Sequence, residues 1–237
     1  MSRRDPERGD RPGRFASAPC WMHELDAEML GFAPEPDEQT RLDVMRWRSA
    51  MREQLIVARR SVPEAARTAR AASIAAHLDS LLGELTGRTI GVYWPIRAEP
   101  DLRGWMRHAQ QRGAVCALPV LIGGAAPLLF RPYRPGMTPE AGVCDIPIPP
   151  AGASVIPGVL IIPLVGFDEA CHGLGYGGGH YDRTLAGMMP RPFAVGVAGA
   201  DAALATVYPQ PHDIPMDAIV TECGVRRRQR PAQSGDG

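Results

Sequence analysis

Apolar residues recur at helical spacing in three segments of the chain. Leu42, Met45 and Leu55 repeat in this way, and no helix-breaking residue interrupts them. Pro63 suits the first turn of a second helix, and a glycine closes the third. The pattern therefore predicts helices over residues 38–59, 63–85 and 101–113.

Short apolar runs alternate with these helices, and a fourth helix is predicted over 179–189. Runs that are too short for a buried helix predict strands over residues 88–96, 114–122, 127–133, 158–167 and 192–199. Strands that are separated by helices or long crossovers indicate an α/β fold. We therefore expect an open, largely parallel sheet with helices on both faces, in a single domain over residues 39–224.

The two ends of the chain lack this periodicity. Residues 1–38 are rich in Arg, Asp, Pro and Gly and are predicted to be a mostly disordered extension. Residues 225–237 are polar and are predicted to form a solvated C-terminal tail.

Charge and cysteine content narrow the class of protein. The chain has 26 basic and 26 acidic residues, so a broad electrostatic surface for nucleic acid is not expected. The five cysteines are scattered without C-x-x-C spacing, which favours a reducing compartment. No apolar run approaches the roughly 18 residues of a membrane span, and no secretory signal is visible. We expect a cytoplasmic monomer with no nucleic-acid or membrane partner.

The segment CHGLGYGGGHYDR, residues 171–183, contains the spacing G-x-G-x-x-G. A dinucleotide-binding fingerprint needs a strand that runs directly into the first glycine and an acidic residue about 20 positions later. Here residues 166–172 intervene, and only Asp201 stands near the required distance. A Walker A loop requires a lysine, and every basic residue of this chain is arginine. Both nucleotide motifs therefore fit poorly.

A phosphate-binding nest fits this glycine segment better. Consecutive glycines leave backbone N–H groups unshielded and allow positive φ. The helix that begins after them adds the positive end of its dipole to the same site. Asp182 beside such a loop is a candidate Mg²⁺ ligand, because Mg²⁺ takes one or two carboxylates together with phosphate oxygens. The alternative is an acidic residue that only stabilises the helix N-terminus.

The stretch PLVGFDEACHGLGYGGGHYDRTLA resembles the signature of the 5-formyltetrahydrofolate cyclo-ligase family, also called 5,10-methenyltetrahydrofolate synthetases. That signature is an apolar strand ending in P-x-x-x-F-D, followed by R-L-G-x-G-x-G-Y-Y-D-R. Three further stretches agree in order: the pair Arg48 and Arg52, the segment 93–102 with Glu99, and the segment 212–222. The resemblance covers about residues 42–222.

The resemblance implies ATP- and Mg²⁺-dependent cyclisation of 5-formyltetrahydrofolate to 5,10-methenyltetrahydrofolate, with release of ADP and phosphate. It implies that Tyr181 and Arg183 are catalytic and that Asp182 and Asp213 hold the metal. Trp94, Glu99 and Tyr176 are the residues implied to bind the folate. The residues implied to bind ATP are Arg48, Arg52, Gly173, Leu174, Gly175, Tyr176, Gly177, Gly178, Gly179, His180 and Tyr181.

The chain departs from the family pattern at two positions of this signature. Gly173 stands where the family commonly has arginine, and His180 stands where it has the first tyrosine of Tyr-Tyr-Asp. His172 is a candidate replacement for the missing cation. Two alternatives therefore stay open: a non-catalytic folate- or nucleotide-binding protein, and a sugar-phosphate or acyl-transfer enzyme on a similar fold.

Overall fold

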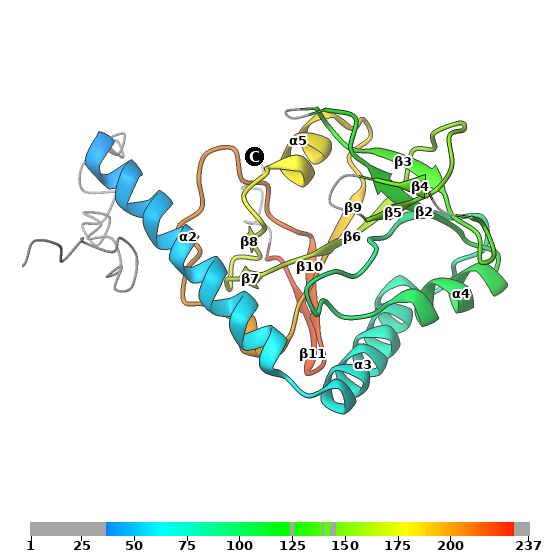
Figure 1. The fold of residues 1–237 in the computed structure, drawn as a ribbon, viewed down its shortest axis with the longest axis horizontal. Helices are drawn as coiled ribbons and strands as arrows, with labels where there is room; N and C mark the ends of the chain where they lie inside the picture. The colour runs from blue at the N-terminus through cyan, green and yellow to red at the C-terminus, as the bar shows by residue number, and fades with distance from the viewer. Residues whose placement is uncertain (1–36, 124–125, 139, 143–145, 230–237) are drawn as a thin grey trace, which may run out of the picture. The chain divides into compact units, whose positions relative to one another are not determined.

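The computed structural model describes residues 37–123, 126–138, 140–142 and 146–229 (Figure 1). The predicted N-terminal extension, apart from its last two residues, lies outside these ranges, and so do residues 230–237 of the predicted tail. The chain divides after Gln54 into two compact units, which are described separately. The helices of the structure are α2 (Glu38–Ser61), α3 (Glu64–Leu82), α4 (Arg103–Gln111) and α5 (His180–Gly187), with a 3-10 turn η3 (Ala200–Ala202).

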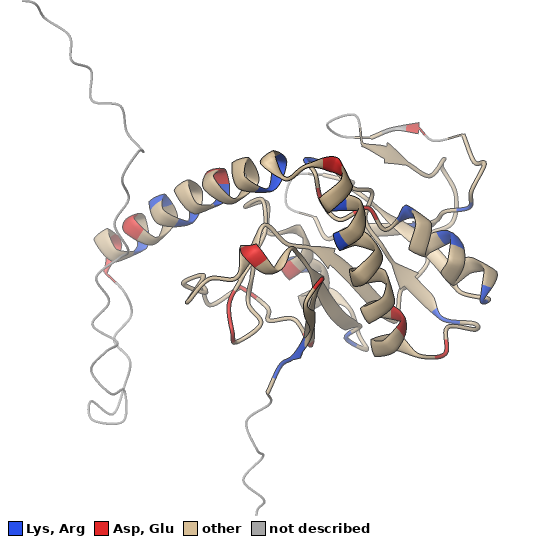
Figure 2. Ribbon diagram, turned by 90° about the horizontal axis from the view of Figure 1, so that it is seen from below, with Lys and Arg blue, Asp and Glu red and all other residues tan. Residues whose placement is uncertain are grey.

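The first unit contributes the N-terminal part of α2. Asp37 precedes the helix, and its carboxylate accepts a hydrogen bond from the backbone N–H of Thr40 (2.7 Å). This bond satisfies one of the free donors of the first turn, and it lowers the pKa of Asp37. Asp43 accepts bonds from Gln39 and Arg46 one turn away on either side. Acidic and basic residues both occur along the helix (Figure 2).

The second unit is built on a seven-stranded sheet. Its order is β11-β10-β9-β6-β1-β2-β3, and all pairs are parallel except the two at the edges, β2 with β3 and β10 with β11. The strands of this sheet are β1 (Thr89–Gly91), β2 (Val115–Val120), β3 (Leu129–Pro132), β6 (Val159–Pro163), β9 (Phe193–Val197), β10 (Ala218–Thr221) and β11 (Gly224–Arg227). Two small antiparallel pairs accompany it: β4 (Glu140–Ala141) with β5 (Pro147–Ile148), and β7 (Gly166–Phe167) with β8 (Gly173–Leu174).

Helices cover both faces of this sheet, which confirms the predicted α/β class. On one face α3 packs on β10 and β11 and α4 packs on β2, while α5 lies on the other side (Figure 1). Successive residues of β6 supply the two cores: Ile161 belongs to the α3–α4 side, and Leu160 belongs to the side that includes Leu185 of α5. This alternation follows from the two-residue period of a strand, and burial on both faces explains the continuous apolar run of β6.

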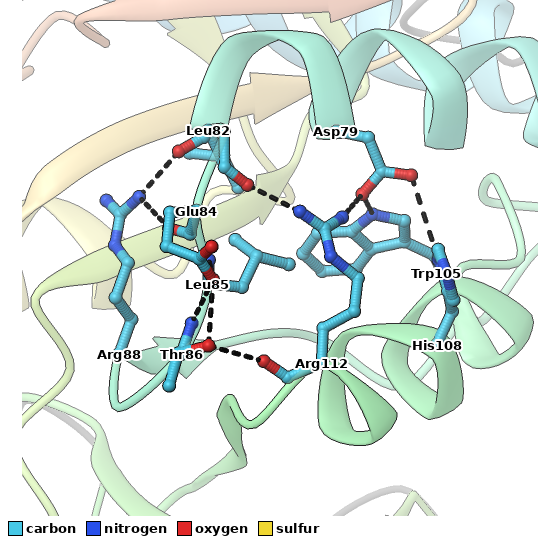
Figure 3. A network of polar contacts seen from close by, with 10 residues as sticks. Asp79, Leu82, Glu84, Leu85, Thr86, Arg88, Trp105, His108 and Arg112 are labelled. Atoms are coloured by element: carbon cyan, nitrogen blue, oxygen red, sulfur yellow. Dashed lines mark hydrogen bonds and ion pairs between the residues drawn. The ribbon is translucent and has the colours of Figure 1, made fainter.

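A polar network ties α3 to α4 far from the glycine segment (Figure 3). The carboxylate of Asp79 accepts hydrogen bonds from Trp105 Nε1 (3.1 Å) and from Arg112 Nη1 (2.8 Å). Arg112 also donates to the backbone carbonyl of Gly83 (2.6 Å), at the end of α3. Trp105 is buried, so its indole N–H needs this acceptor. The network fixes how two helices meet over one face of the sheet.

The strands differ from the sequence prediction at several points. The run 158–167 breaks into β6 and β7, because Leu164 N still bonds to β9 whereas Val165 N bonds to Leu174 O in the glycine segment. The strand expected over 88–96 is regular only over β1. Strands β10 and β11 were not predicted, and β11 includes residues 225–227, which the sequence assigned to the tail. The break after β6 arises where pairing with a distant segment sets the conformation, whereas β11 forms a hairpin with the adjacent β10.

The direction of the connections reverses between β1 and β6. From β1 the chain continues to β2 on one side, whereas from β6 it continues to β9 on the other. In open α/β sheets ligands bind at such a switch point, beyond the carboxyl ends of the strands. The segments that follow β1 and β6 carry Glu99 and the glycine segment. No helix in the described ranges is both long enough and apolar enough to cross a membrane.

Candidate functional site

The glycine segment forms a hairpin that leads into α5. β7 and β8 pair antiparallel, and the chain then runs through Gly175–Gly179 to the first residue of the helix, His180. Gly177 and Gly179 have positive φ values of 94° and 62°. Only glycine adopts such values without strain, so these two positions need glycine to make the turn. The loop ends at the N-terminus of α5, and its role as an anion-binding nest stays a prediction.

Two further glycines of this segment are required by close packing. A Cβ atom on Gly173 would lie 2.6 Å from Leu164 Cδ2, and one on Gly178 would lie 2.7 Å from the ring of His180. Leu164 therefore fills the space that a side chain at position 173 would need. This packing gives a physical reason why glycine stands there where the family commonly has arginine.

His172 contacts Asp168 in this structure, and its replacement of the missing cation stays a prediction. Its backbone N–H donates to Asp168 Oδ1 (2.9 Å), and its ring Nδ1 lies 3.7 Å from the same oxygen. Asp168 is buried and also accepts the backbone N–H of Val207 (3.3 Å). The ring of His172 is thus directed at the turn that precedes the glycine segment, where the pair has a structural role.

Arg183 holds the backbone of the glycine loop. Its Nη2 donates to the carbonyl oxygen of Gly178 (2.6 Å) and lies 3.1 Å from Nδ1 of His180. Its Nε is buried and has no hydrogen-bond partner. Tyr181, on the same helix, is half-buried, and burial followed by the charge of Glu99 raises the pKa of its hydroxyl. The catalytic roles of Arg183 and Tyr181 stay predictions, and the structure assigns Arg183 a contact that stabilises the loop.

The structure brings Asp182 beside the segment that carries Asp213. Asp182 Oδ1 accepts a hydrogen bond from the backbone N–H of Ile214 (3.0 Å). Asp213 Oδ2 accepts the backbone N–H of Gln210 (2.9 Å). Within the described ranges no group of three or more His, Cys, Asp or Glu residues could hold a metal ion. Carboxylates are ligands that Mg²⁺ accepts together with phosphate oxygens, and the roles of Asp182 and Asp213 in holding it stay predictions.

Glu99 lies at the end of the segment that follows β1 and is almost completely buried, with 6% of its surface exposed. Its Oε2 accepts the backbone N–H of Ile96 (2.9 Å), and its Oε1 accepts a hydrogen bond from the hydroxyl of Tyr176 (2.7 Å). Burial raises the pKa of Glu99, while these two hydrogen bonds and the cations Arg59 and Arg97 act in the opposite direction. The site therefore contains a buried carboxylate that is held by specific donors.

Arg59 completes this arrangement and was not identified from the sequence. It donates to the carbonyl of Arg97 (Nε, 3.0 Å), the carbonyl of Leu164 (Nη1, 3.4 Å) and the hydroxyl of Tyr176 (Nη2, 2.6 Å). These acceptors follow β1, β6 and β8. In the sequence Arg59 is one of many arginines on a helix, and no local signal separates it from the rest.

The turn before Glu99 is conformationally strained. Arg97 and Ala98 have positive φ values of 48° and 61°, a region that non-glycine residues rarely adopt. Such strain costs of order 1–3 kcal/mol for each residue and persists only where its surroundings hold it. The bond from Arg59 to the carbonyl of Arg97 is one such restraint. Strain next to a buried carboxylate is typical of a functional site.

A recess opens at the same edge of the sheet. It lies between the end of α2, the first turns of α3, and the segments that follow β1, β6 and β9. The recess combines apolar walls with three arginines and two carboxylates. Its lining residues are Leu55, Ala58, Arg59, Val62, Arg67, Arg70, Ile74, Ala98, Glu99, Pro100, Leu164, Val165, Gly199, Asp201 and Ala202. Glu99 and Arg59 thus belong both to this recess and to the contact with the glycine segment.

The roles predicted for Trp94 and for the pair Arg48 and Arg52 are not tested by their contacts in the structure. The indole of Trp94 packs edge-on against Tyr133 (5.8 Å between ring centroids), with the Arg103 guanidinium 5.3 Å from its centroid. Its contact with folate stays a prediction. Arg48 and Arg52 lie one turn apart in the part of α2 that belongs to the first unit. Their contact with a triphosphate likewise stays a prediction.

The fold and the site together define a class of protein. It is an open α/β protein with a glycine-rich turn, a helix N-terminus and a buried glutamate at the switch point of its sheet. A model of the 5-formyltetrahydrofolate cyclo-ligase family matches residues 44–222. The chain belongs to this family, which confirms the resemblance that the glycine segment suggested.

Relatives from three bacteria agree with this assignment. The chain is 33% identical over 184 residues to a 5-formyltetrahydrofolate cyclo-ligase of Mycolicibacterium smegmatis, a match that covers 74% of this chain and 94% of that protein. It is 36% identical over 141 residues to the enzyme of the same name from Escherichia coli, covering 56% and 77%. The NMR structure of Aquifex aeolicus 5,10-methenyltetrahydrofolate synthetase superimposes with a TM-score of 0.68 at 26% identity, over 80% of this chain and 96% of that one.

Proposed function

We propose that this protein catalyses the ATP- and Mg²⁺-dependent cyclisation of 5-formyltetrahydrofolate to 5,10-methenyltetrahydrofolate, with release of ADP and phosphate. One contact carries this proposal. The hydrogen bond from Tyr176 to Glu99 joins residues 77 positions apart and brings the glycine segment to the buried carboxylate. This contact supports a proposed nest for phosphate next to a proposed acceptor for a heterocycle at one edge of the sheet.

The nest suits the triphosphate of ATP. Gly177 and Gly179 allow backbone N–H groups to face an anion, and the dipole of α5 favours the same charge. Arg183 keeps the loop in this form through its bond to Gly178. Arg48 and Arg52 are proposed to contact the triphosphate as well, because two arginines one turn apart on a helix can pair with adjacent phosphates.

Glu99 suits the pterin ring of the folate. Each carboxylate oxygen has a second lone pair beyond the bond that it accepts within the protein. The amino and ring N–H groups of a pterin are donors that these lone pairs can accept. Because Glu99 is buried, such bonds are stronger than they would be in water. Trp94 is proposed to offer a flat apolar surface to the same ring.

The reaction requires little proton chemistry from the protein. The formyl oxygen attacks the terminal phosphorus of ATP, and ADP leaves with the electrons of the broken P–O bond. The neighbouring secondary amine nitrogen of the folate then attacks the activated formyl carbon and gives up its proton. Phosphate departs with the former formyl oxygen and the electrons of the broken C–O bond, and it can take up that proton. The chain's own residues position the two substrates and exclude water, which is where such catalysts gain most of their rate.

Asp182 and Asp213 are the residues that we propose hold Mg²⁺. When bound, the ion would neutralise negative charge on the phosphates. Carboxylate oxygens on two adjacent segments are donors of the kind that Mg²⁺ prefers, and the remaining ligands would be phosphate oxygens and water. A cytoplasmic location and a monomeric state stay predictions.

The test uses the purified protein with 5-formyltetrahydrofolate, ATP and Mg²⁺. We expect the near-ultraviolet absorbance of the methenyl product to rise and one ADP to appear for each product molecule. Omission of ATP is the control and should abolish the signal. Absence of product at high enzyme concentration, or product without ADP, would contradict the proposed function.

A further inference from the structure

Tyr176 has a large side chain, whereas its neighbours in the loop are glycines. It stands between Gly175 and Gly177, where side chains are absent on either side. Its hydroxyl is committed in two directions, since it accepts a hydrogen bond from Arg59 (2.6 Å) and donates one to Glu99 (2.7 Å). A tyrosine hydroxyl has one donor and two acceptor lone pairs, so both bonds form together.

The ring of Tyr176 is held as firmly as its hydroxyl. The guanidinium of Arg97 lies 5.1 Å from the ring centroid, and that of Arg59 lies 5.9 Å from it. Both distances are within the range of a cation–π contact. Arg59 in turn fixes the carbonyls of Arg97 and Leu164. The guanidinium of Arg59 thus positions the hydroxyl of Tyr176 and also contacts segments that follow two different strands.

We propose that Tyr176 is a positioning residue for the folate: its hydroxyl, oriented by Arg59, holds the carboxylate of Glu99 toward the pterin, and only the backbone around Tyr176 serves ATP. This inference rests on the proposed function and separates two roles that the sequence assigned to one residue. Without the hydroxyl, one oxygen of Glu99 loses its donor, and the side chain can turn away from the substrate.

Several charged and titratable groups face Glu99 and share in its titration. Loss of the Tyr176 hydroxyl removes a bond that favours the ionised form, so the pKa of Glu99 should rise above its already raised position. The ionised form accepts the pterin donors, and the acid limb of folate use should therefore move to higher pH. The groups that face Glu99 or line the same recess are Arg59 of α2, Arg67 and Arg70 of α3, Tyr93 and Arg97 beyond β1, Tyr176 and Tyr181 of the glycine segment and α5, and Asp201 of η3.

The experiment compares Tyr176→Phe with the wild-type enzyme in steady-state kinetics. We expect the KM for 5-formyltetrahydrofolate to rise about 10-fold at saturating ATP, which corresponds to about 1.4 kcal/mol. The KM for ATP should stay within about 2-fold, since no bond of the hydroxyl is assigned to ATP. The acid limb of kcat/KM for the folate should shift to higher pH. Tyr133→Phe, which keeps the ring against Trp94, is the matched control and should change neither constant.

A double-mutant cycle with Glu99→Gln separates positioning from a general loss of packing. If Tyr176 acts through Glu99, adding Tyr176→Phe to Glu99→Gln should raise the folate KM little further. Three results would each overturn the inference. They are single-variant effects on the folate KM that multiply in the double variant, an acid limb of kcat/KM that does not shift in Tyr176→Phe, and a KM for ATP that rises as much as the folate KM. Circular dichroism melting checks that the variants fold. Arg59→Lys, which keeps the charge but not the planar fork, gives the same prediction if Tyr176→Phe does not fold.

The outcomes distinguish this inference from the proposed function. A wild-type enzyme that forms no methenyl product refutes both. A wild-type enzyme that turns over while Tyr176→Phe keeps the wild-type folate KM and pH profile refutes the inference alone.

Discussion

Replacing Glu99 by glutamine removes the charge of a side chain that is 6% exposed while keeping its size. The amide oxygen can still accept the backbone N–H of Ile96. The amide nitrogen then faces Tyr176, whose hydroxyl can become an acceptor, because it has a lone pair beyond the one that accepts from Arg59. The local fold should therefore persist, and the replacement should mainly weaken binding of the pterin.

Two effects of this replacement have opposite signs. One charged acceptor for the pterin becomes a donor, and a hydrogen bond to a charged group contributes about 1.5–3 kcal/mol. A loss of about 2 kcal/mol corresponds to roughly 30-fold in the KM for the folate. Stability should change the other way, because burial raises the pKa of Glu99 in the folded state. Its stabilising contribution is complete below the unfolded-state pKa and is lost as pH rises through the folded-state pKa.

Steady-state kinetics and urea unfolding over a range of pH measure these two effects. Relative to wild type, Glu99→Gln should gain stability as pH rises from acid to neutral, and the acid limb of kcat/KM for the folate should disappear. Glu64→Gln, at an exposed position in the first turn of α3, is the matched control. An unchanged folate KM, or an acid limb that survives in Glu99→Gln, would refute the reasoning.

Three further replacements test other parts of the structure. Gly179→Ala should raise the KM for ATP about 10-fold and lower the melting temperature, because the residue has a φ of 62° and its Cβ would lie 2.8 Å from Arg183 Nη1; an unchanged KM for ATP would count against the nest. Asp182→Asn should raise the Mg²⁺ concentration for half-maximal rate roughly 10-fold or more, and an unaltered Mg²⁺ requirement would remove this residue from the metal site. Asp79→Ala should cost about 2 kcal/mol of unfolding free energy in urea, because the indole N–H of Trp105 is buried and loses its acceptor. Asp79→Asn is the control, since its amide oxygen can still accept this bond, and equal losses in the two variants would contradict the assignment.

Much of the fold follows from local patterns. The helices were predicted because apolar spacing and terminal residues such as Pro63 are visible within a few turns of chain. The apolar run of β6 predicted a strand that is buried on both faces. Strand β11 was missed because its side chains are mostly exposed and polar and carry no apolar alternation. Strand β10 was missed although its four residues are buried, because the apolar run is very short.

The turn and the helix start of the glycine segment could also be predicted from the sequence. Glycines at positive φ and an acidic residue in the first turn of a helix are local features, and the structure has them at Gly177, Gly179 and Asp182. The departure at Gly173 was visible, but its reason was not, because Leu164 is brought against it by the turn from β6 into β7.

The partners of Glu99 depended on the tertiary structure alone. The family resemblance marked Glu99 and Tyr176 as candidates for binding the folate, and it also listed Tyr176 with the phosphate loop. The order of the strands brings Tyr176 to Glu99 across 77 residues and Arg59 to Tyr176 across 117. Periodicity reports only on neighbours within a few residues, whereas these contacts arise because β1 and β6 lie side by side and their following segments meet at one edge of the sheet. The sequence by itself thus determined the helices, most strands of the sheet and the glycine turn before α5, and only the tertiary structure decided which side chains hold the buried carboxylate.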